Sequence, residues 1–67
     1  MDDKQFKAAM ETIVAALKER GYDPYGQLYG YISENEPAYI TSYNNARRLI
    51  QSLDIERVRR YVMEMKR

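Results

Sequence analysis

The apolar positions along the chain recur at helical spacing and divide it into four amphipathic segments. In residues 3–20 the large apolar side chains are three or four positions apart and form one stripe on a helix: Phe6, Met10, Ile13 and Leu17. Asp2 or Asp3 can cap the beginning of this helix, and Gly21 suits the left-handed conformation that often ends one. The pattern predicts a first helix over residues 3–20.

A second, shorter helix is predicted to begin at Asp23-Pro24, because aspartate is a good N-cap and proline is favoured at the first helical position. Its body, residues 25–32, contains Gly26 and Gly30. Each glycine weakens a helix by about 1 kcal/mol relative to alanine. Such glycines are tolerated where another backbone comes close, or in a loose surface turn. Residues 33–37 follow as a polar turn.

A third helix is predicted from about residue 41 to residue 53, and its apolar side is formed by Ala46, Leu49, Ile50 and Leu53. Asp54 can cap a fourth helix, whose inward positions are Ile55, Val58, Val62 and Met65. The alternation of apolar and polar residues that marks strands is weak throughout. We therefore expect one all-α domain over residues 1–67, a small helical domain of about four helices.

A chain of 67 residues buries only a marginal core and usually needs a further source of stability. It has no cysteine and no histidine, which excludes disulfides and removes the usual ligands of zinc. Self-association remains as a source of stability, so we expect a homodimer whose subunits share a helix-bundle core. The residues expected in the core or at the dimer contact are Phe6, Met10, Ile13, Leu17, Leu49, Ile50, Val58, Val62 and Met65.

The missing residue types also argue against catalysis, because histidine is the commonest general base and cysteine the commonest reactive nucleophile. No phosphate-binding glycine loop or calcium-binding loop occurs. We expect no catalytic residue, no cofactor and no metal. No apolar run approaches the roughly 20 residues that span a bilayer, and the acidic, polar start of the chain is unlike a signal peptide. The expectation is a cytoplasmic protein without a membrane partner.

Tyrosine is the densest feature of the sequence, with six of its seven copies between residues 22 and 43. These rings can cover the rims of a thin core, which is the favoured interpretation, or form a surface or groove for a protein, peptide or small ligand. The asparagine pair beside Arg47 can cap a helix, again the favoured interpretation, or hold an anion. The expected partner or ligand surface comprises Tyr22, Pro24, Gln27, Tyr31, Pro37, Tyr39, Tyr43, Asn44, Asn45 and Arg47.

Charge is unevenly distributed although the net charge is only +1. Residues 1–36 carry four basic and seven acidic side chains, whereas residues 37–67 carry seven basic and three acidic ones. The arginines of the second half can form a nucleic-acid surface or a solvated helix face. An isoelectric point of about 8.0 is below that of a typical nucleic-acid-binding domain, so we favour the solvated face and expect no nucleic-acid partner.

The middle of the chain resembles the IreB family of small bacterial proteins. The resemblance lies in an ordered set of motifs: Gly21-Tyr22-Asp23-Pro24, Gln27, Gly30-Tyr31, Glu36-Pro37-Ala38-Tyr39 and Tyr43-Asn44-Asn45-Ala46-Arg47. It covers residues 17–62, and so many motifs at constant spacing are more specific than any one of them. Glu36 stands where the family usually has aspartate, and Thr41 stands where it usually has proline.

This resemblance implies a helical, cytosolic homodimer, mainly of Gram-positive bacteria, without a cofactor or catalytic activity. One branch of the family is a negative regulator of cephalosporin resistance and cell-envelope stress signalling, downstream of a Ser/Thr kinase. The implied partners are therefore a second copy of the chain, an unidentified protein and a Ser/Thr kinase. In that branch the phosphorylated threonines precede the first helix, whereas the earliest hydroxyl in this sequence is Thr12, so no phosphorylation site is transferred.

Overall fold

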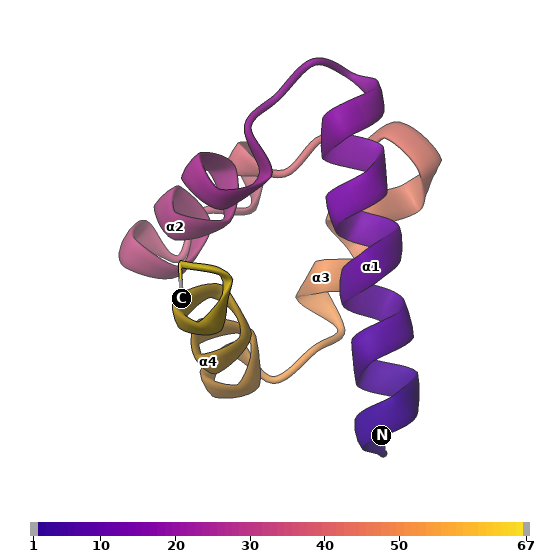
Figure 1. Ribbon diagram of the computed structural model, residues 1–67. Helices are drawn as coiled ribbons and strands as arrows, with labels where there is room; N and C mark the ends of the chain where they lie inside the picture. The colour runs from indigo at the N-terminus through magenta and orange to yellow at the C-terminus, as the bar shows by residue number, and fades with distance from the viewer. Residues whose placement is uncertain (1, 67) are drawn as a thin grey trace.

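The computed structural model describes residues 2–66, and this part of the chain is built from helices without strands, which confirms the all-α prediction. The elements in chain order are α1 (Asp3–Glu19), α2 (Pro24–Glu34), two short 3-10 turns, η1 (Pro37–Tyr39) and η2 (Tyr43–Asn45), then α3 (Ala46–Gln51) and α4 (Ile55–Met65). In Figure 1, α1 runs along one side of the molecule, while α2 and α4 lie together on the other side. The short helix α3 lies between them and packs against α1.

The ends of α1 follow from local hydrogen bonds that the sequence signals anticipate. The Asp2 carboxylate accepts from the Gln5 backbone amide at 2.8 Å, and the Gln5 side chain accepts in return from the Asp2 amide at 3.3 Å. At the other end Gly21 takes a φ of +84°, which lets the Tyr22 amide donate to the carbonyl of Leu17 at 2.9 Å. The chain therefore turns away from α1 within two residues.

The third helix differs from its prediction. A helix was expected from about residue 41, but α3 begins at Ala46 and is preceded by the turn η2. Asn44 and Asn45 have φ values of 56° and 64°, which are left-handed and interrupt a right-handed helix. The predicted polar turn also extends further and contains the 3-10 turn η1. Both differences fall in the same connection between α2 and α3.

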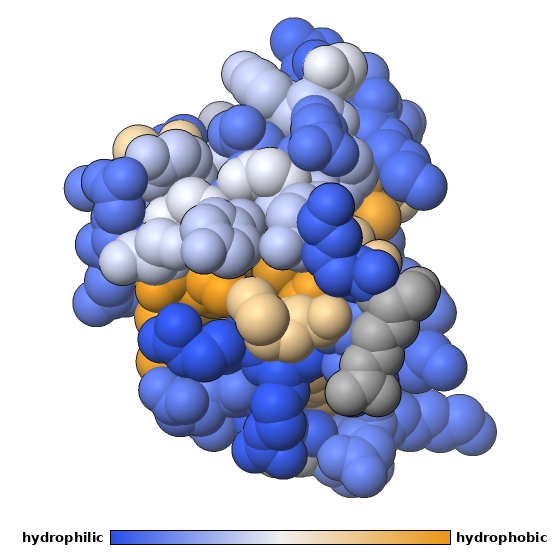
Figure 2. All heavy atoms as spheres, turned by 60° about the vertical axis from the view of Figure 1, so that its left-hand side comes forward, coloured by the Kyte–Doolittle hydropathy of each residue, from blue (hydrophilic) through white to orange (hydrophobic). Residues whose placement is uncertain are grey.

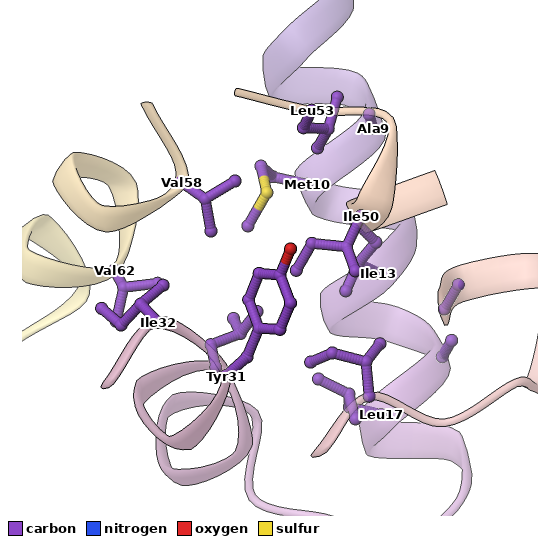
Figure 3. Close-up of a cluster of buried hydrophobic side chains, with 14 of the residues drawn as sticks. Ala9, Met10, Ile13, Leu17, Tyr31, Ile32, Ile50, Leu53, Val58 and Val62 are labelled. Atoms are coloured by element: carbon purple, nitrogen blue, oxygen red, sulfur yellow. The ribbon is translucent and has the colours of Figure 1, made fainter. Parts of the chain in front are cut away.

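The core is made by residues of α1, α2, α3 and α4 together with Ile40 and Leu53, and Figure 3 shows most of these side chains converging. Six of the residues that were expected in the core or at a dimer contact are buried within this one chain: Phe6, Met10, Ile13, Leu17, Val58 and Val62. Ile50 is also buried, whereas Leu49 is only partly buried and Met65 is 36% exposed. The buried residues therefore contribute to the core of the single chain, as one part of the expectation for them stated.

Tyr31 is the clearest correction among the expected surface residues. It is only 4% exposed, and in Figure 3 its ring enters the core with the hydroxyl directed toward the side chains of Met10 and Ile50. Leu28, Tyr31 and Ile32 are three and four residues apart, so they form the buried stripe of α2. Tyr31 is therefore part of the core because of its position in the helical repeat, which the number of tyrosines does not reveal.

Candidate interaction surface

The connection between α2 and α3, residues 35–45, is held at two successive carbonyl groups. The Gln27 side-chain amide donates to the carbonyl of Tyr39 at 2.8 Å, and the Arg47 Nε donates to the carbonyl of Ile40 at 2.8 Å. The Ile40 side chain is fully buried between these two anchors. We call residues 35–45 the strap, because side chains from α2 and α3 hold it against the core.

A close approach between α2 and the ring of Tyr39 requires glycine at position 30. A Cβ atom added to Gly30 would lie 2.5 Å from the Tyr39 ring, which is well inside van der Waals contact. The Tyr39 hydroxyl then donates to the Glu34 carboxylate at 2.9 Å. The weak helix residue Gly30 is therefore explained by the packing of the strap, although the group that comes close is a side-chain ring and not another backbone as predicted.

Several other motif residues set the local conformation of the backbone. Asp23 accepts from the Gly26 amide and so caps α2, in which Pro24 takes the first position. Pro37 begins η1, and the Glu36 carboxylate accepts from the Ala38 amide at 3.1 Å. Asn45 precedes α3 without a side-chain capping bond, so the expected cap is absent there. The asparagine pair instead provides two left-handed residues.

Two exposed tyrosines of the expected surface stand near the end of α1 and in η2. Tyr22 and Tyr43 are 49% and 41% exposed. The Tyr43 hydroxyl is 3.4 Å from a carboxylate oxygen of Glu19, and the Arg20 guanidinium lies 5.4 Å from the centre of the Tyr43 ring. We call Glu19, Arg20, Tyr22 and Tyr43 the tyrosine surface. Sequence reasoning missed Glu19 and Arg20, because their contact with η2 spans about 24 residues and has no local signal.

The pKa values of three tyrosines rise above the ordinary value. Burial raises the pKa of Tyr31, and the hydrogen bond to Glu34, followed by the charge of that carboxylate, raises the pKa of Tyr39. Burial and then the charge of Glu11 raise the pKa of Tyr61. Each of these shifts favours the neutral phenol over the phenolate.

The structure keeps together only part of the expected surface. Gln27, Pro37, Tyr39 and Arg47 meet at the strap, and Tyr22 lies apart from them at the end of α1. Gln27 and Tyr39 also line a shallow hollow of about 340 Å³ beside Glu34 and Glu36. Within residues 2–66 no cluster of three or more metal-ligating side chains is present. In the same range no helix is long and apolar enough to cross a bilayer.

The fold and the strap together define a small all-helical domain whose distinctive residues mainly hold one connecting segment. The model of a protein family described as IreB regulatory phosphoprotein matches residues 1–65. A UPF0297 protein of Ruminiclostridium cellulolyticum is 38% identical over 71 residues, which cover 96% of this chain and 81% of that relative. The chain therefore belongs to the IreB family, as its motifs predicted, and a regulatory role is supported by this membership.

Proposed function

We propose that this chain is a non-enzymatic cytosolic regulator that acts by binding another protein, within the cell-envelope stress and cephalosporin-resistance signalling that depends on a Ser/Thr kinase. The exposure of Tyr22 and Tyr43 beside Glu19 and Arg20 is the observation that carries this proposal. Tyrosine and arginine are enriched at protein interfaces, where a ring supplies apolar contact and its hydroxyl a hydrogen bond. Membership of a regulatory phosphoprotein family supports the same role.

The proposal is tested with a photoreactive phenylalanine analogue placed at position 22 or 43 in the native host. Both positions should crosslink to the same partner, and the exposed Ala15 on α1 serves as the control position. Arg20→Ala should weaken the purified complex at least about tenfold, as expected for an interface residue worth more than about 1.4 kcal/mol. Different partners at positions 22 and 43, or equal crosslinking from position 15, would contradict the proposed surface.

The regulatory pathway is tested separately by deleting the gene in its native host. Because the proposed role is negative regulation, the deletion should raise cephalosporin resistance, and the wild-type chain should restore susceptibility. Arg20→Ala should fail to restore it although the variant is folded. An unchanged susceptibility in the deletion strain would rule out this pathway without ruling out the binding surface.

We also propose that the chain forms a homodimer through the face that carries α2 and α4. Figure 2 shows apolar atoms in a band across this face, with polar atoms on both sides. Met63 on α4 is 46% exposed and Tyr29 on α2 is 48% exposed, so both are available for contact. Sedimentation at micromolar concentration should show a dimer that Met63→Glu dissociates. A wild-type monomer under these conditions would end the dimer proposal.

A further inference from the structure

A groove between α1 and α4 has an apolar floor that the core does not use fully. It is open to solvent and has a volume of about 530 Å³, which is comparable with that of small-ligand sites. Phe6 and Tyr61 meet edge to face with their ring centres 6.2 Å apart, and Met65 lies beside them with 36% of its surface exposed. An incoming apolar side chain could therefore contact Met65 and the edges of both rings.

Cationic side chains stand on both walls of this groove. Arg57 on α4 lies over the Phe6 ring, 4.4 Å from its centre, and reaches the Asp3 carboxylate at 2.8 Å. Lys7 on α1 and Arg60 on α4 line the opposite walls. Among the described residues neither Lys7 nor Arg60 has a charged or hydrogen-bonding partner, in contrast to Arg59, which pairs with Glu56 at 3.6 Å. A carboxylate entering the groove would meet a cation from each side.

The remaining groove residues favour a peptide over a nucleic acid. The carboxylates of Asp3 and Glu64 also line the groove and would repel a phosphate backbone. Phe6 is only 7% exposed, so the face of its ring is not available for base stacking. A peptide can place one carboxylate between Lys7 and Arg60 and keep the rest of its surface neutral or apolar, which avoids both acids.

We propose that the α1–α4 groove binds an acidic amphipathic peptide segment of a partner protein. A bulky apolar side chain of that segment would pack on Tyr61 and Met65, and a neighbouring aspartate or glutamate would pair with Lys7 and Arg60. The site shares no residue with the tyrosine surface, so it constitutes a second contact. Its failure would leave the proposed function untouched.

The experiment is a selection of displayed random 12-residue peptides on the full chain, followed by fluorescence anisotropy of the enriched peptides. Enriched sequences should carry an acidic residue next to a leucine, phenylalanine or tryptophan. The double variant Lys7→Glu/Arg60→Glu should weaken their binding at least about tenfold, or about 1.4 kcal/mol. The matched control Lys18→Glu/Arg48→Glu changes two exposed cations that do not line the groove and should bind as the wild type does.

Three results would overturn the proposal. The first is the absence of any enriched peptide, or enrichment of peptides that bind both double variants equally. The second is displacement of the peptides by a single-stranded oligonucleotide that binds more tightly, which would make the groove a nucleic-acid site. The third is loss of self-association in Lys7→Glu/Arg60→Glu alone, which would assign the groove to a second copy of the chain. Circular dichroism of each double variant confirms that it is folded.

Discussion

Two parts of the molecule, the strap and the α1–α4 groove, are held together by different kinds of interaction. The strap is held by partly buried hydrogen bonds from Gln27 and Arg47, and it inserts the fully buried Ile40. The α1–α4 groove is bridged by the ion pair of Arg57 with Asp3, whose side chain is fully exposed to solvent. A partly buried bond holds a segment in one conformation, whereas an exposed ion pair contributes little and can be exchanged for a partner's carboxylate.

This difference separates residues that hold the structure from residues that are open to a ligand. The motifs that make the sequence recognisable are concentrated at the strap, where Gly30, Gln27 and Arg47 each have a structural role. The groove residues Lys7 and Arg60 belong to no motif of the chain. Recognisable motifs therefore point here to backbone geometry more than to a binding site.

The largest expected effect comes from removing the apolar anchor of the strap. Ile40→Ala deletes a fully buried side chain and leaves a cavity, so the free energy of unfolding should fall by about 2–5 kcal/mol. Met65→Ala in the groove is the matched change, and because Met65 is partly exposed it should alter stability by no more than about 0.5 kcal/mol. Urea unfolding followed by circular dichroism measures both. Equal losses would mean that the strap is no better packed than the groove.

A second test concerns the close contact between α2 and the strap. Gly30→Ala places a methyl group against the Tyr39 ring, so we expect a loss of about 1–3 kcal/mol in the free energy of unfolding. In the double variant Gly30→Ala/Tyr39→Ala the clash is absent, and its loss should be smaller than the sum of the two single losses by at least about 0.5 kcal/mol. Additive losses in this double-mutant cycle would show that the ring does not constrain position 30.

The two regions also differ in what raises the pKa of their tyrosines. The pKa of Tyr39 in the strap is raised mainly by its hydrogen bond to Glu34, whereas the pKa of Tyr61 in the groove is raised mainly by burial. Glu34→Gln should therefore lower the pKa of Tyr39 and leave that of Tyr61 unchanged. Ultraviolet absorbance titration, with Tyr39→Phe and Tyr61→Phe to assign each phenol, measures both values.

These shifts also predict how stability depends on pH. Because the folded pKa values exceed the unfolded value of about 10, their contribution is complete below about pH 10 and is lost as pH rises through the folded values. The unfolding midpoint should thus decrease as the pH rises above about 10, and Tyr61→Phe should reduce this decrease. A fall of the same size in Tyr61→Phe would mean that burial in the groove does not perturb this phenol.

The sequence predicts the helices and the core well because both depend on periodic spacing. Phe6, Met10, Ile13 and Leu17 form the buried side of α1 as their positions require, and Asp23 and Asp54 cap the helices that follow them. Tyr31 shows where the same signal was overlooked, since it stands three residues after Leu28 on the buried stripe of α2. The helical spacing of these residues predicts that Tyr31 is buried, but the clustering of tyrosines suggested an exposed surface instead.

The strap and the groove could not be predicted in the same way. Asn44 and Asn45 adopt left-handed conformations that a helical pattern does not reveal, so the third helix was extended too far toward the N-terminus. The bonds from Gln27 and Arg47 depend on where two helices bring the strap, and the groove depends on how far α1 and α4 diverge. These features are set by tertiary geometry.

The smallest effect on stability is expected at the ion pair that bridges the groove. Asp3→Asn removes the charge that Arg57 contacts at 2.8 Å, but the fully exposed Asp3 side chain is screened by solvent, so the unfolding midpoint should not change measurably. The same substitution removes one of the two carboxylates that line the groove, which should strengthen the binding of acidic peptides, most clearly at low salt. Fluorescence anisotropy at low and moderate salt measures this gain, with Asp2→Asn as the control because Asp2 caps α1 and does not line the groove. If Asp3→Asn destabilised the fold and left peptide affinity unchanged, the ion pair would be a structural clamp like those of the strap, and the contrast between the two regions would not hold.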